Sequence, residues 1–487
     1  MKSPMKTKDT PGLDRRRFLQ GTAGLAGTAL FTGGTLLTSV SSYAQNPPSC
    51  PAPPPSGGTP FVPGSDKRPV VLRKSIGAFN SAELTKLQDA YTALRNLPAG
   101  DNRRWLIQAD MHALFCASCT NSPTDIHGSW TFFPWHRAYL YYFERILGSL
   151  VKDLDNFRLP YWDWENIRTL PPPYATPGSA ANSLWDGSRN SGLAGGGNLP
   201  STDGTASRIT TLYGLSDFAT FGGDAFSGGS LEDDPHGIIH VDVGLPSLPR
   251  HDMGSLGYAA RDPLFFAHHC NIDKLWSGWN DLASGGSGTD YKNPTDSAFL
   301  NARWSFWDEN QNVVSISAGD VLDHEHNLRY IYKSPEIRFH RFDLILECRF
   351  ICCRPGPDPG PFLEVTEQVR EMVQRAFRAE SPVVLVLRQV SIPAGISGSF
   401  DVVAVRGERK TVVGAIGALD HGHVAHRKTH SITLSLDVTK AAEDLFAKEK
   451  PATLHVYRRA VERTKEKRQA EAFVLKAERA EIRLEKR

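Results

Sequence analysis

The chain has 487 residues, of which 40% are hydrophobic and 22% charged, enough for two or three domains with sizeable cores. Its formal net charge of +2 gives no argument for a polyanionic partner, so we expect no nucleic acid among its ligands. Beyond the N-terminal segment no apolar run is long enough to cross a bilayer, so we expect no membrane contact once that segment is removed.

The first 44 residues have the features of an export signal. The basic sequence DRRRFL at residues 14–19 precedes a weakly apolar stretch at 21–40, and residues 42–44 fit a small-x-small cleavage site. The paired arginines resemble a bacterial twin-arginine signal, which implies a periplasmic or secreted protein that is exported folded and metal-loaded. A membrane span is the alternative, although the stretch is rich in Gly, Thr and Ser.

Two helices are predicted after a Pro-rich N-terminal arm at residues 45–69, which should lie extended over the surface. The first covers 81–95, with Ser81 as its cap. Its apolar residues recur at helical spacing: Leu84, Leu87, Tyr91 and Leu94. The second covers 102–112 and ends at His112, the first candidate metal ligand.

Three histidines form a first candidate metal pocket. His112 ends a helix, His127 follows in a loop, and His136 lies near the start of the helix predicted over 132–153. The aromatic residues of that helix should pack the core around the site. Residues 167–229 are rich in Gly, Ser, Pro and Thr, which predicts a long functional or poorly ordered loop.

A second pocket is predicted between residues 233 and 273. His236 and His240 are four residues apart, so on a helix they share one face. A third imidazole could come from His268 or His269, which follow the apolar sequence LFFA. Single histidines are more often core or surface residues, but two clusters with aromatic surroundings favour a metal site. Imidazole suits zinc, copper, iron and nickel, so the donor type leaves the metal open.

These motifs resemble the type-3 copper phenol oxidases, the family of tyrosinases and catechol oxidases, and suggest a bacterial member similar to the plant enzymes. The resemblance runs from about residue 68 to 332 and includes WTFFPWHRAYLYYFE, PHGIIH and AARDPLFFAHHCNID. It implies a mainly α catalytic domain, an antiparallel helix bundle that holds two copper ions with O2 as co-substrate. The family places a ligand four residues before an Asp, which selects His269. The implied ligands are His112, His127, His136, His236, His240 and His269.

The resemblance also implies roles for a carboxylate and three cysteines. Glu232, one turn before His236, would hold a water and help to deprotonate the phenol; a capping or solvated carboxylate is the alternative. Cys116 would form a thioether to His127, or be a structural thiol. Cys50 would form a disulfide with Cys119, or be a free thiol in a loose arm.

Four further residues are expected near the substrate or the ligands. Gly237, Val241 and Leu256 would form the substrate gate, and the lack of Asn at 237 argues against efficient monophenol hydroxylation. Leu256 replaces a family Phe and should admit bulkier phenols. Asp273 would accept a hydrogen bond from an imidazole N–H and so orient a ligand; a surface carboxylate is the alternative.

The domain limits follow from composition and from the resemblance. The sequence SFWDEN and the motif Tyr330 to Tyr332 match the end of the family's catalytic domain, which we therefore place at 70–332. Residues 333–361 form a Cys- and Pro-rich linker, whose three cysteines indicate disulfides or free thiols more than a metal site. Strand patterns from Val383 onwards predict a C-terminal β-sandwich domain at 362–487, which the resemblance suggests covers the active site. Its four loop histidines between 421 and 430 are interpreted as solvated.

The expected function is that of a copper-dependent oxidoreductase, a tyrosinase or polyphenol oxidase that hydroxylates monophenols and oxidises o-diphenols to o-quinones. Its partners would be small phenols such as tyrosine, L-DOPA and catechols, together with a copper chaperone. Three alternatives remain: a catechol oxidase without hydroxylation, a hemocyanin-like oxygen carrier, and a dinuclear zinc hydrolase. The missing bridging carboxylate argues against the hydrolase.

Overall fold

The computed structural model describes residues 50–485 with several gaps. The undescribed positions within that span are 117, 120, 122, 176–181, 246–250, 284–289, 334–339, 353–359, 394, 420–429 and 460–470. The predicted export signal, most of the histidine-containing loop after residue 420, and Cys353 therefore lie outside the described residues. Among the helices of the described part, none combines the length and the apolar character needed to cross a bilayer.

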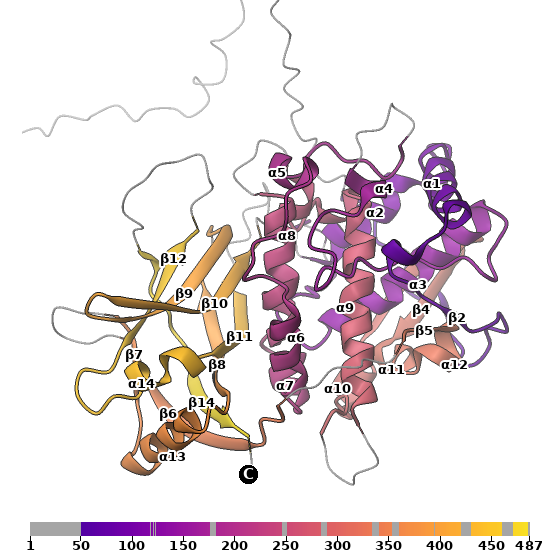
Figure 1. The fold of residues 1–487 in the computed structure, drawn as a ribbon. Coiled ribbons are helices and arrows are strands. Elements are labelled where there is room, and N and C mark those ends of the chain that lie inside the picture. Colours follow the sequence, from indigo (N-terminus) through magenta and orange to yellow (C-terminus); the bar gives the residue numbers. More distant parts are fainter. Residues whose placement is uncertain are drawn as a thin grey trace, which may run out of the picture. The chain divides into compact units, whose positions relative to one another are not determined.

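A helical region comes first along the chain (Figure 1). Its longer helices are α1 (Ser81–Arg95), α2 (Trp105–Phe115), α3 (Phe132–Leu150), α6 (Ala206–Tyr213), α8 (Ile238–Val243) and α9 (Leu264–Asp281). Shorter helices are α4 (Pro172–Ala175), α5 (Ser191–Ala194), α7 (Phe218–Phe221), α10 (Ser297–Leu300), α11 (Ala318–Val321) and α12 (His324–Leu328). Helix α3 packs against both α1 and α9, so two of the histidine-containing helices adjoin. The segment 167–229, predicted as a loop, contains four of these helices.

Helix α1 begins one residue earlier than its predicted cap implies. The cap is Asn80, whose side chain accepts the backbone N–H of Glu83 while the Glu83 carboxylate accepts the N–H of Asn80. Ser81 is the first helical residue, so its prediction as the cap is wrong. The periodic residues Leu87, Tyr91 and Leu94 are fully buried, as helical spacing requires.

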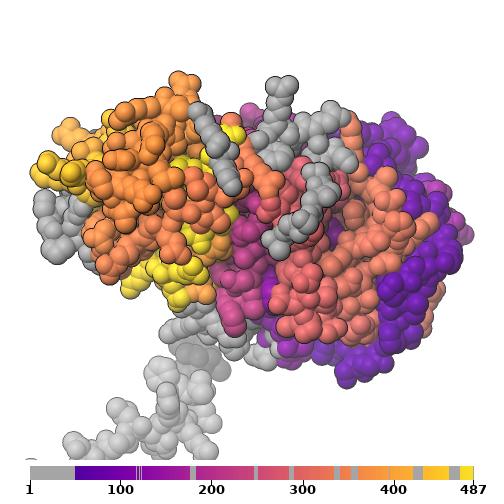
Figure 2. All heavy atoms as spheres, turned by 90° about the horizontal axis from the view of Figure 1, so that it is seen from below, coloured from indigo at the N-terminus to yellow at the C-terminus, as the bar shows by residue number. Residues whose placement is uncertain are grey.

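Short strands connect the start of the helical region to its end. β1 (Thr59–Pro60) pairs in parallel with β4 (Val313–Ser317), which pairs antiparallel with β3 (Arg303–Trp307). β2 (Val71–Leu72) pairs in parallel with β5 (Tyr330–Ile331). In Figure 2 the indigo residues from the first part of the described chain and the salmon residues near 300–330 adjoin on one face. These pairings hold the N-terminal arm against the helices.

The C-terminal region is rich in strands, as predicted, but its strands form one continuous sheet. The order is β10-β9-β12-β7-β6-β14-β8-β11, with β13 beside β12. The strands are β6 (Leu344–Ile351), β7 (Phe362–Glu364), β8 (Val383–Ile392), β9 (Gly398–Arg406), β10 (Arg409–Ala418), β11 (His430–Asp437), β12 (Thr453–Arg458), β13 (Glu471–Phe473) and β14 (Arg479–Leu484). Helices α13 (Glu367–Arg378) and α14 (Ala442–Leu445) accompany them.

Strand β6 joins the two halves of the sheet, and the predicted sandwich stays a prediction. Residues 344–348 pair with β14 and residues 349–351 pair with β7, so one strand continues from one half of the sheet into the other. This strand lies inside the segment 333–361, which was predicted as a linker.

Strand β8 contributes to two hydrophobic cores. Val384 and Val386 belong to the core of the helical region, whereas Val383, Leu385 and Leu387 belong to the core formed by the C-terminal strands. Because alternate residues of a strand point to opposite faces, both faces of β8 are buried, which accounts for its uninterrupted apolar sequence. The helical and strand-rich regions are therefore packed together through this strand.

Candidate metal centre

The first three predicted ligands come together around one point. His112 lies in α2, His127 in the loop after it, and His136 in the first turns of α3. Their ring centroids are 5.2 Å (His112–His127), 5.5 Å (His112–His136) and 5.4 Å (His127–His136) apart. One nitrogen from each ring lies within 4.8 Å of the others. The three rings can therefore share one ion.

The second cluster contains four imidazoles where three were predicted. His236 lies at the end of an irregular helical turn, Glu232–Gly237, and His240 in α8. His268 and His269 are consecutive in α9, and one nitrogen from each of the four rings lies within 4.8 Å of the others. The His240 and His269 Nε2 atoms are 3.2 Å apart. Since the rings of His136 and His269 stack at 4.2 Å, the two clusters adjoin.

Backbone carbonyls orient four of the six predicted ligands. The Nδ1 atom of His112 donates to Leu256 O at 2.8 Å and that of His240 to Met253 O at 2.9 Å. The remaining two bonds lie within one helical turn: His136 Nδ1 to Phe132 O at 2.7 Å and His236 Nδ1 to Glu232 O at 2.6 Å. A neutral imidazole that donates through Nδ1 keeps the lone pair on Nε2 for a metal.

The same imidazoles are buried, and three of their Nε2 atoms lack a partner. His112, His136 and His236 each have a buried Nε2 with no hydrogen bond. Burial lowers the pKa of His112 to about 3 and that of His240 to about 4, and it holds the pKa of His136 and His236 well below 6.5. Neutral rings with unpaired lone pairs are what a metal pair requires, so the donor set fits two ions.

Glu232 lies beside the clusters, in a pocket. Its Oε1 accepts the backbone N–H of Gly128 at 2.8 Å, whereas its buried Oε2 has no hydrogen-bond partner. Burial raises the pKa of Glu232 well above 4.5. A side chain with one held and one unpaired oxygen can exchange a proton with a bound ligand.

The pocket is lined from both regions of the chain. Helical-region residues in its wall are His127, Gly128, Glu232, Asp233, His236, Gly237 and Leu256. Residues from the C-terminal strands and their connections are Ile392, Pro393, Gly395, Ile396, Gly417, Ala418, Leu419 and Ile432. The wall is apolar apart from two imidazoles and two carboxyl groups, and contains no Lys or Arg among the described residues. Such a lining suits an aromatic molecule.

Two family profiles match the chain. The profile described as the common central domain of tyrosinase matches residues 102–213 and 196–282, and that of the polyphenol oxidase middle domain matches 293–342. The crystal structure of Grenache (Vitis vinifera) polyphenol oxidase is 31% identical, with a TM-score of 0.53, and the match covers 60% of this chain and 94% of that one. The chain belongs to the tyrosinase and polyphenol oxidase family.

Curated relatives of the chain include plant polyphenol oxidases. The latent polyphenol oxidase of Prunus armeniaca is 35% identical over 298 residues, which are 54% of this chain and 49% of that protein. A polyphenol oxidase of Vitis vinifera is 32% identical over 384 residues, 68% of this chain and 61% of that protein. The chain thus spans about half to three fifths of their length. Latent apple tyrosinase, 24% identical with a TM-score of 0.60, covers 88% of this chain and 99% of its own, and shows the fold.

These relatives do not support two predictions made from the N-terminal sequence. Both carry the word chloroplastic in their names, so neither a bacterial origin nor twin-arginine export is supported. The arginine pair at the start of the chain was the basis of both predictions.

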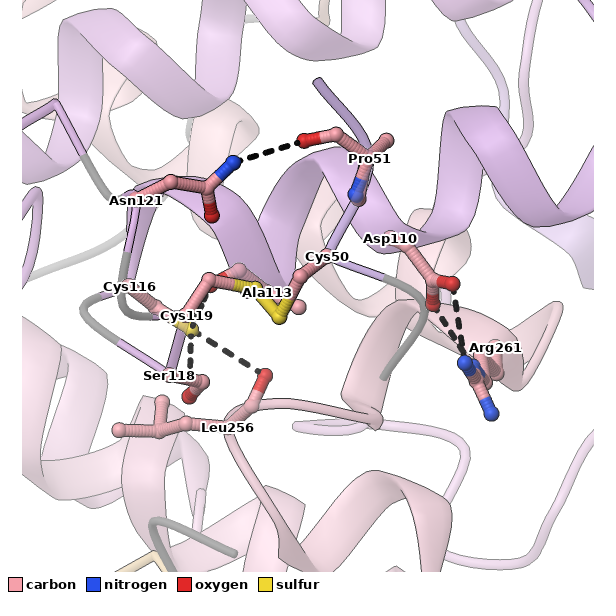
Figure 3. The surroundings of a disulfide bond; sticks show 10 residues. All are labelled: Cys50, Pro51, Asp110, Ala113, Cys116, Ser118, Cys119, Asn121, Leu256 and Arg261. Carbon is pink, nitrogen blue, oxygen red and sulfur yellow. Dashed lines mark hydrogen bonds and ion pairs between the residues drawn. A yellow bond between two sulfur atoms is a disulfide. The ribbon is translucent and has the colours of Figure 1, made fainter. Parts of the chain in front are cut away.

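The cysteines predicted from the family resemblance lie at the end of α2 (Figure 3). Cys50 and Cys119 form a disulfide that ties the N-terminal arm to the loop after α2. Cys116 is a buried free thiol whose Sγ lies 3.1 Å from Ser118 Oγ and 3.5 Å from Leu256 O. Its covalent bond to His127 stays a prediction.

Two of the three predicted gate residues line the pocket. Leu256 and Gly237 are in its wall, whereas Val241 is 1% exposed and lies outside the lining. A Cβ atom added at Gly237 would lie 2.9 Å from Gly417 O in β10. A larger residue at position 237 would thus press on the C-terminal strands, so packing as well as substrate choice favours Gly here.

Asp273 does not orient an imidazole, contrary to the prediction. Its carboxylate accepts hydrogen bonds from Arg137 Nε at 2.6 Å, Arg73 Nη1 at 3.2 Å, Tyr330 Oη at 2.6 Å and Tyr332 Oη at 2.9 Å. Burial alone would raise the pKa of Asp273, but the two guanidinium groups hold it below 3.8. The carboxylate fixes α9, and hence His269, through the helix backbone.

Some groups at the site were not predicted from the sequence. The backbone carbonyls of Met253 and Leu256 orient ligands. Because every residue has such a carbonyl, the sequence does not indicate which of them accept hydrogen bonds from the ligands. Asp233, which also lines the pocket, follows Glu232 and was not among the predicted site residues. Its burial, which raises its pKa well above 3.8, could not be seen from the sequence.

Proposed function

We propose that the chain is a copper-dependent oxidoreductase that uses O2 to oxidise o-diphenols to o-quinones and to hydroxylate monophenols. The observation that carries this proposal is the pair of adjoining imidazole clusters, in which His112, His136 and His236 are buried, have lowered pKa values and have unpaired Nε2 atoms. His112, His127 and His136 would hold one copper ion, and His236, His240 and His269 the other. Bound copper supplies two-electron redox chemistry with O2, and imidazole tolerates both of its oxidation states.

The protein side of the reaction is binding, orientation and proton transfer. The apolar pocket would hold a phenol ring beside His127 and His236, with water excluded by the surrounding leucine and isoleucine side chains. An o-diphenol loses two protons and two electrons as it becomes a quinone. We propose that the unpaired Oε2 of Glu232 takes the first phenolic proton.

The direct test is oxygen uptake by copper-loaded protein with catechol, L-DOPA and tyrosine. Uptake with catechol and L-DOPA, accompanied by quinone absorbance, is the expected result. Uptake with tyrosine separates a tyrosinase from a catechol oxidase, and Gly237 predicts a slow response. Reversible oxygen binding without quinone would instead indicate an oxygen carrier, and a protein that takes up no copper would contradict the assignment.

Replacing Glu232 by Gln should lower kcat/KM for catechol by about 10²–10⁴-fold. A base acts when it is ionised, and burial raises the pKa of Glu232. The wild-type rate should therefore rise with pH up to a higher value than an ordinary carboxyl would give, and this acidic limb should be absent in Glu232→Gln. The matched control is Asp233→Asn, which changes the neighbouring pocket carboxyl. Equal losses in both variants would contradict a specific role for Glu232.

We also propose that residues 362–487 act as a cover over the catalytic region, 70–332. Support comes from pocket-lining residues such as Ile392 and Ile432. Ion pairs connect the two regions: Arg459 with Asp203, and Arg388 and Arg483 with Asp217. A backbone bridge between Gly228 and Ile432 adds to them.

Acid should loosen this cover. Burial alone would raise the pKa of Asp217, but Arg483 and Arg388 hold it below 3.8. A carboxyl group with a lowered pKa stabilises the docked state above about pH 4, and that contribution is lost as pH falls through the lowered pKa. The variant Asp217→Asn should oxidise catechol faster than wild type at neutral pH. Brief acid treatment should increase its rate of catechol oxidation less than that of wild type. The control is the exposed Asp155→Asn, and an unchanged rate in Asp217→Asn would contradict the cover.

The thioether between Cys116 and His127 is proposed from the family resemblance. Its formation replaces the S–H bond of Cys116 and a ring C–H bond of His127 by one C–S bond, and O2, the oxidant of the proposed reaction, takes up the two electrons and two protons. Apart from the bound copper, the intact protein should therefore be lighter by two hydrogen atoms than the sum of its residues, beyond the loss at the disulfide. Cys116 and His127 lie in one tryptic peptide, residues 105–137, so a protease that cleaves before Asp125 is needed to separate them. After reduction of the disulfide, the fragments on either side of that cut should stay linked in wild type and come apart in Cys116→Ser. Separate fragments in wild type would contradict the bond.

A further inference from the structure

The second cluster has one imidazole more than a three-ligand site needs. His268 is fully buried, its ring stacks on that of His236 at 5.4 Å, and it meets the ring of His240 edge-on at 4.7 Å. One of its nitrogens lies among the candidate donor atoms of His236, His240 and His269. Four imidazoles around one ion would form a closed site, without the open position that a reacting ligand requires.

One hydrogen bond decides whether His268 can be a donor. The indole Nε1 of Trp164 lies 3.1 Å from His268 Nδ1. An indole N–H can only donate, so Nδ1 must be the acceptor and holds no proton. The single proton of the ring is then on Nε2. Neither nitrogen offers a free lone pair: Nδ1 uses its own with Trp164, and Nε2 carries hydrogen. This holds whichever nitrogen faces the ion.

Trp164 is well fixed for this role. Its side chain is fully buried, and its backbone N–H donates to Trp162 O at 2.8 Å. The ring lies so close to Gly204 that a Cβ atom there would be 2.8 Å from its Cε3 atom. The indole therefore has little room to turn away from His268.

We propose that Trp164 is a positioning residue that withholds His268 from the metal, so that the site of His236, His240 and His269 keeps three nitrogen donors and an open position. The inference rests on the proposed dicopper site, but it concerns metal binding and can be tested without turnover. It predicts that loss of the indole N–H turns His268 into a fourth ligand.

The experiment compares Trp164→Phe with wild type by zinc titration of the copper-free full-length protein in a calorimeter. Zinc is the probe because it accepts four nitrogen donors in tetrahedral geometry. One of the two zinc equivalents should bind on the order of tenfold more tightly in Trp164→Phe. If Trp164 only supported the packing of the core, its replacement would weaken zinc binding. Tighter zinc binding would therefore distinguish the proposed role from a structural one. Copper-loaded Trp164→Phe should also lose oxygen uptake with catechol.

Two further variants and one control make the result decisive. Trp164→Phe/His268→Phe removes both partners and should return zinc affinity to the wild-type value. His268→Gln keeps an acceptor for Trp164 and should still bind two zinc ions with unchanged affinity. Trp162→Phe is the matched control, because it removes another buried indole N–H, which donates to Ile167 O.

The outcomes separate this inference from the proposed function. Equal zinc affinity in Trp164→Phe and Trp162→Phe would overturn the inference, and so would the loss of one zinc equivalent in His268→Gln, since His268 would then be a ligand. If Trp164→Phe does not fold, His268→Gln still tests whether His268 is a ligand, and a lost zinc equivalent there overturns the inference. Zinc binding as expected, with no oxygen uptake by copper-loaded wild type, would overturn the proposed function alone.

Discussion

Replacing His240 by Ala should abolish oxygen uptake with both catechol and L-DOPA and should leave about one copper ion per chain. The Nε2 of His240 lies 3.2 Å from that of His269, so the two rings point at one position, and removal of one leaves two donors for that ion. Copper content by metal analysis and oxygen uptake on the same sample measure the two effects.

The control for this variant is His326→Ala. His326 is an exposed histidine that hydrogen-bonds Asp323, far along the chain from either cluster. It should keep two copper ions and the wild-type rate. Full copper content or retained turnover in His240→Ala would show that the ligand assignment is wrong.

Replacing Asp273 by Ala should lower the free energy of unfolding by about 3–5 kcal/mol. The carboxylate lies between the buried guanidinium groups of Arg73 and Arg137, so its removal leaves Arg137 without its carboxylate partner and Arg73 with that of Glu144. Urea unfolding of the copper-free variant measures the loss directly.

A matched surface variant separates this effect from the general cost of losing an ion pair. Glu364 pairs with Arg349 at 3.4 Å, and both side chains are more than half exposed. Glu364→Ala should therefore change the free energy of unfolding by less than about 1 kcal/mol. Similar losses in the two variants would contradict the idea that burial makes the Asp273 network costly to break.

The six imidazoles could be predicted because their spacing and surroundings are local features. His236 and His240 are four residues apart, and His136 lies in a strongly apolar helix, so their faces follow from helical geometry. His268 and His269 are different, because both lie within the cluster. The family pattern selects His269, and the hydrogen bond from Trp164, about a hundred residues earlier in the chain, is the basis of our proposal that His268 is not a ligand. No local pattern could have indicated this bond.

Errors in the prediction arose where long-range contacts or competing signals decide the structure. Asp273 follows His269 by one helical turn, which suggested an imidazole partner. Instead, side chains that are distant from it in the sequence donate hydrogen bonds to its carboxylate oxygens. Apolar and polar residues alternate along β6, which is typical of a strand and visible in the sequence. The cysteines and prolines after it favoured the prediction of a linker. Helix α13 has a clear amphipathic pattern, and we predicted only strands from this region.

Strand β8 makes the stability of the helical region and that of the C-terminal strands depend on each other. With Val384 and Val386 on one side and Leu385 and Leu387 on the other, neither region is complete without it. Heating should thus melt both in one cooperative transition. Proteolytic removal of about the last hundred residues would take Val384 and Val386 out of the core of the helical region and expose an apolar surface there. The shortened protein should therefore aggregate more readily.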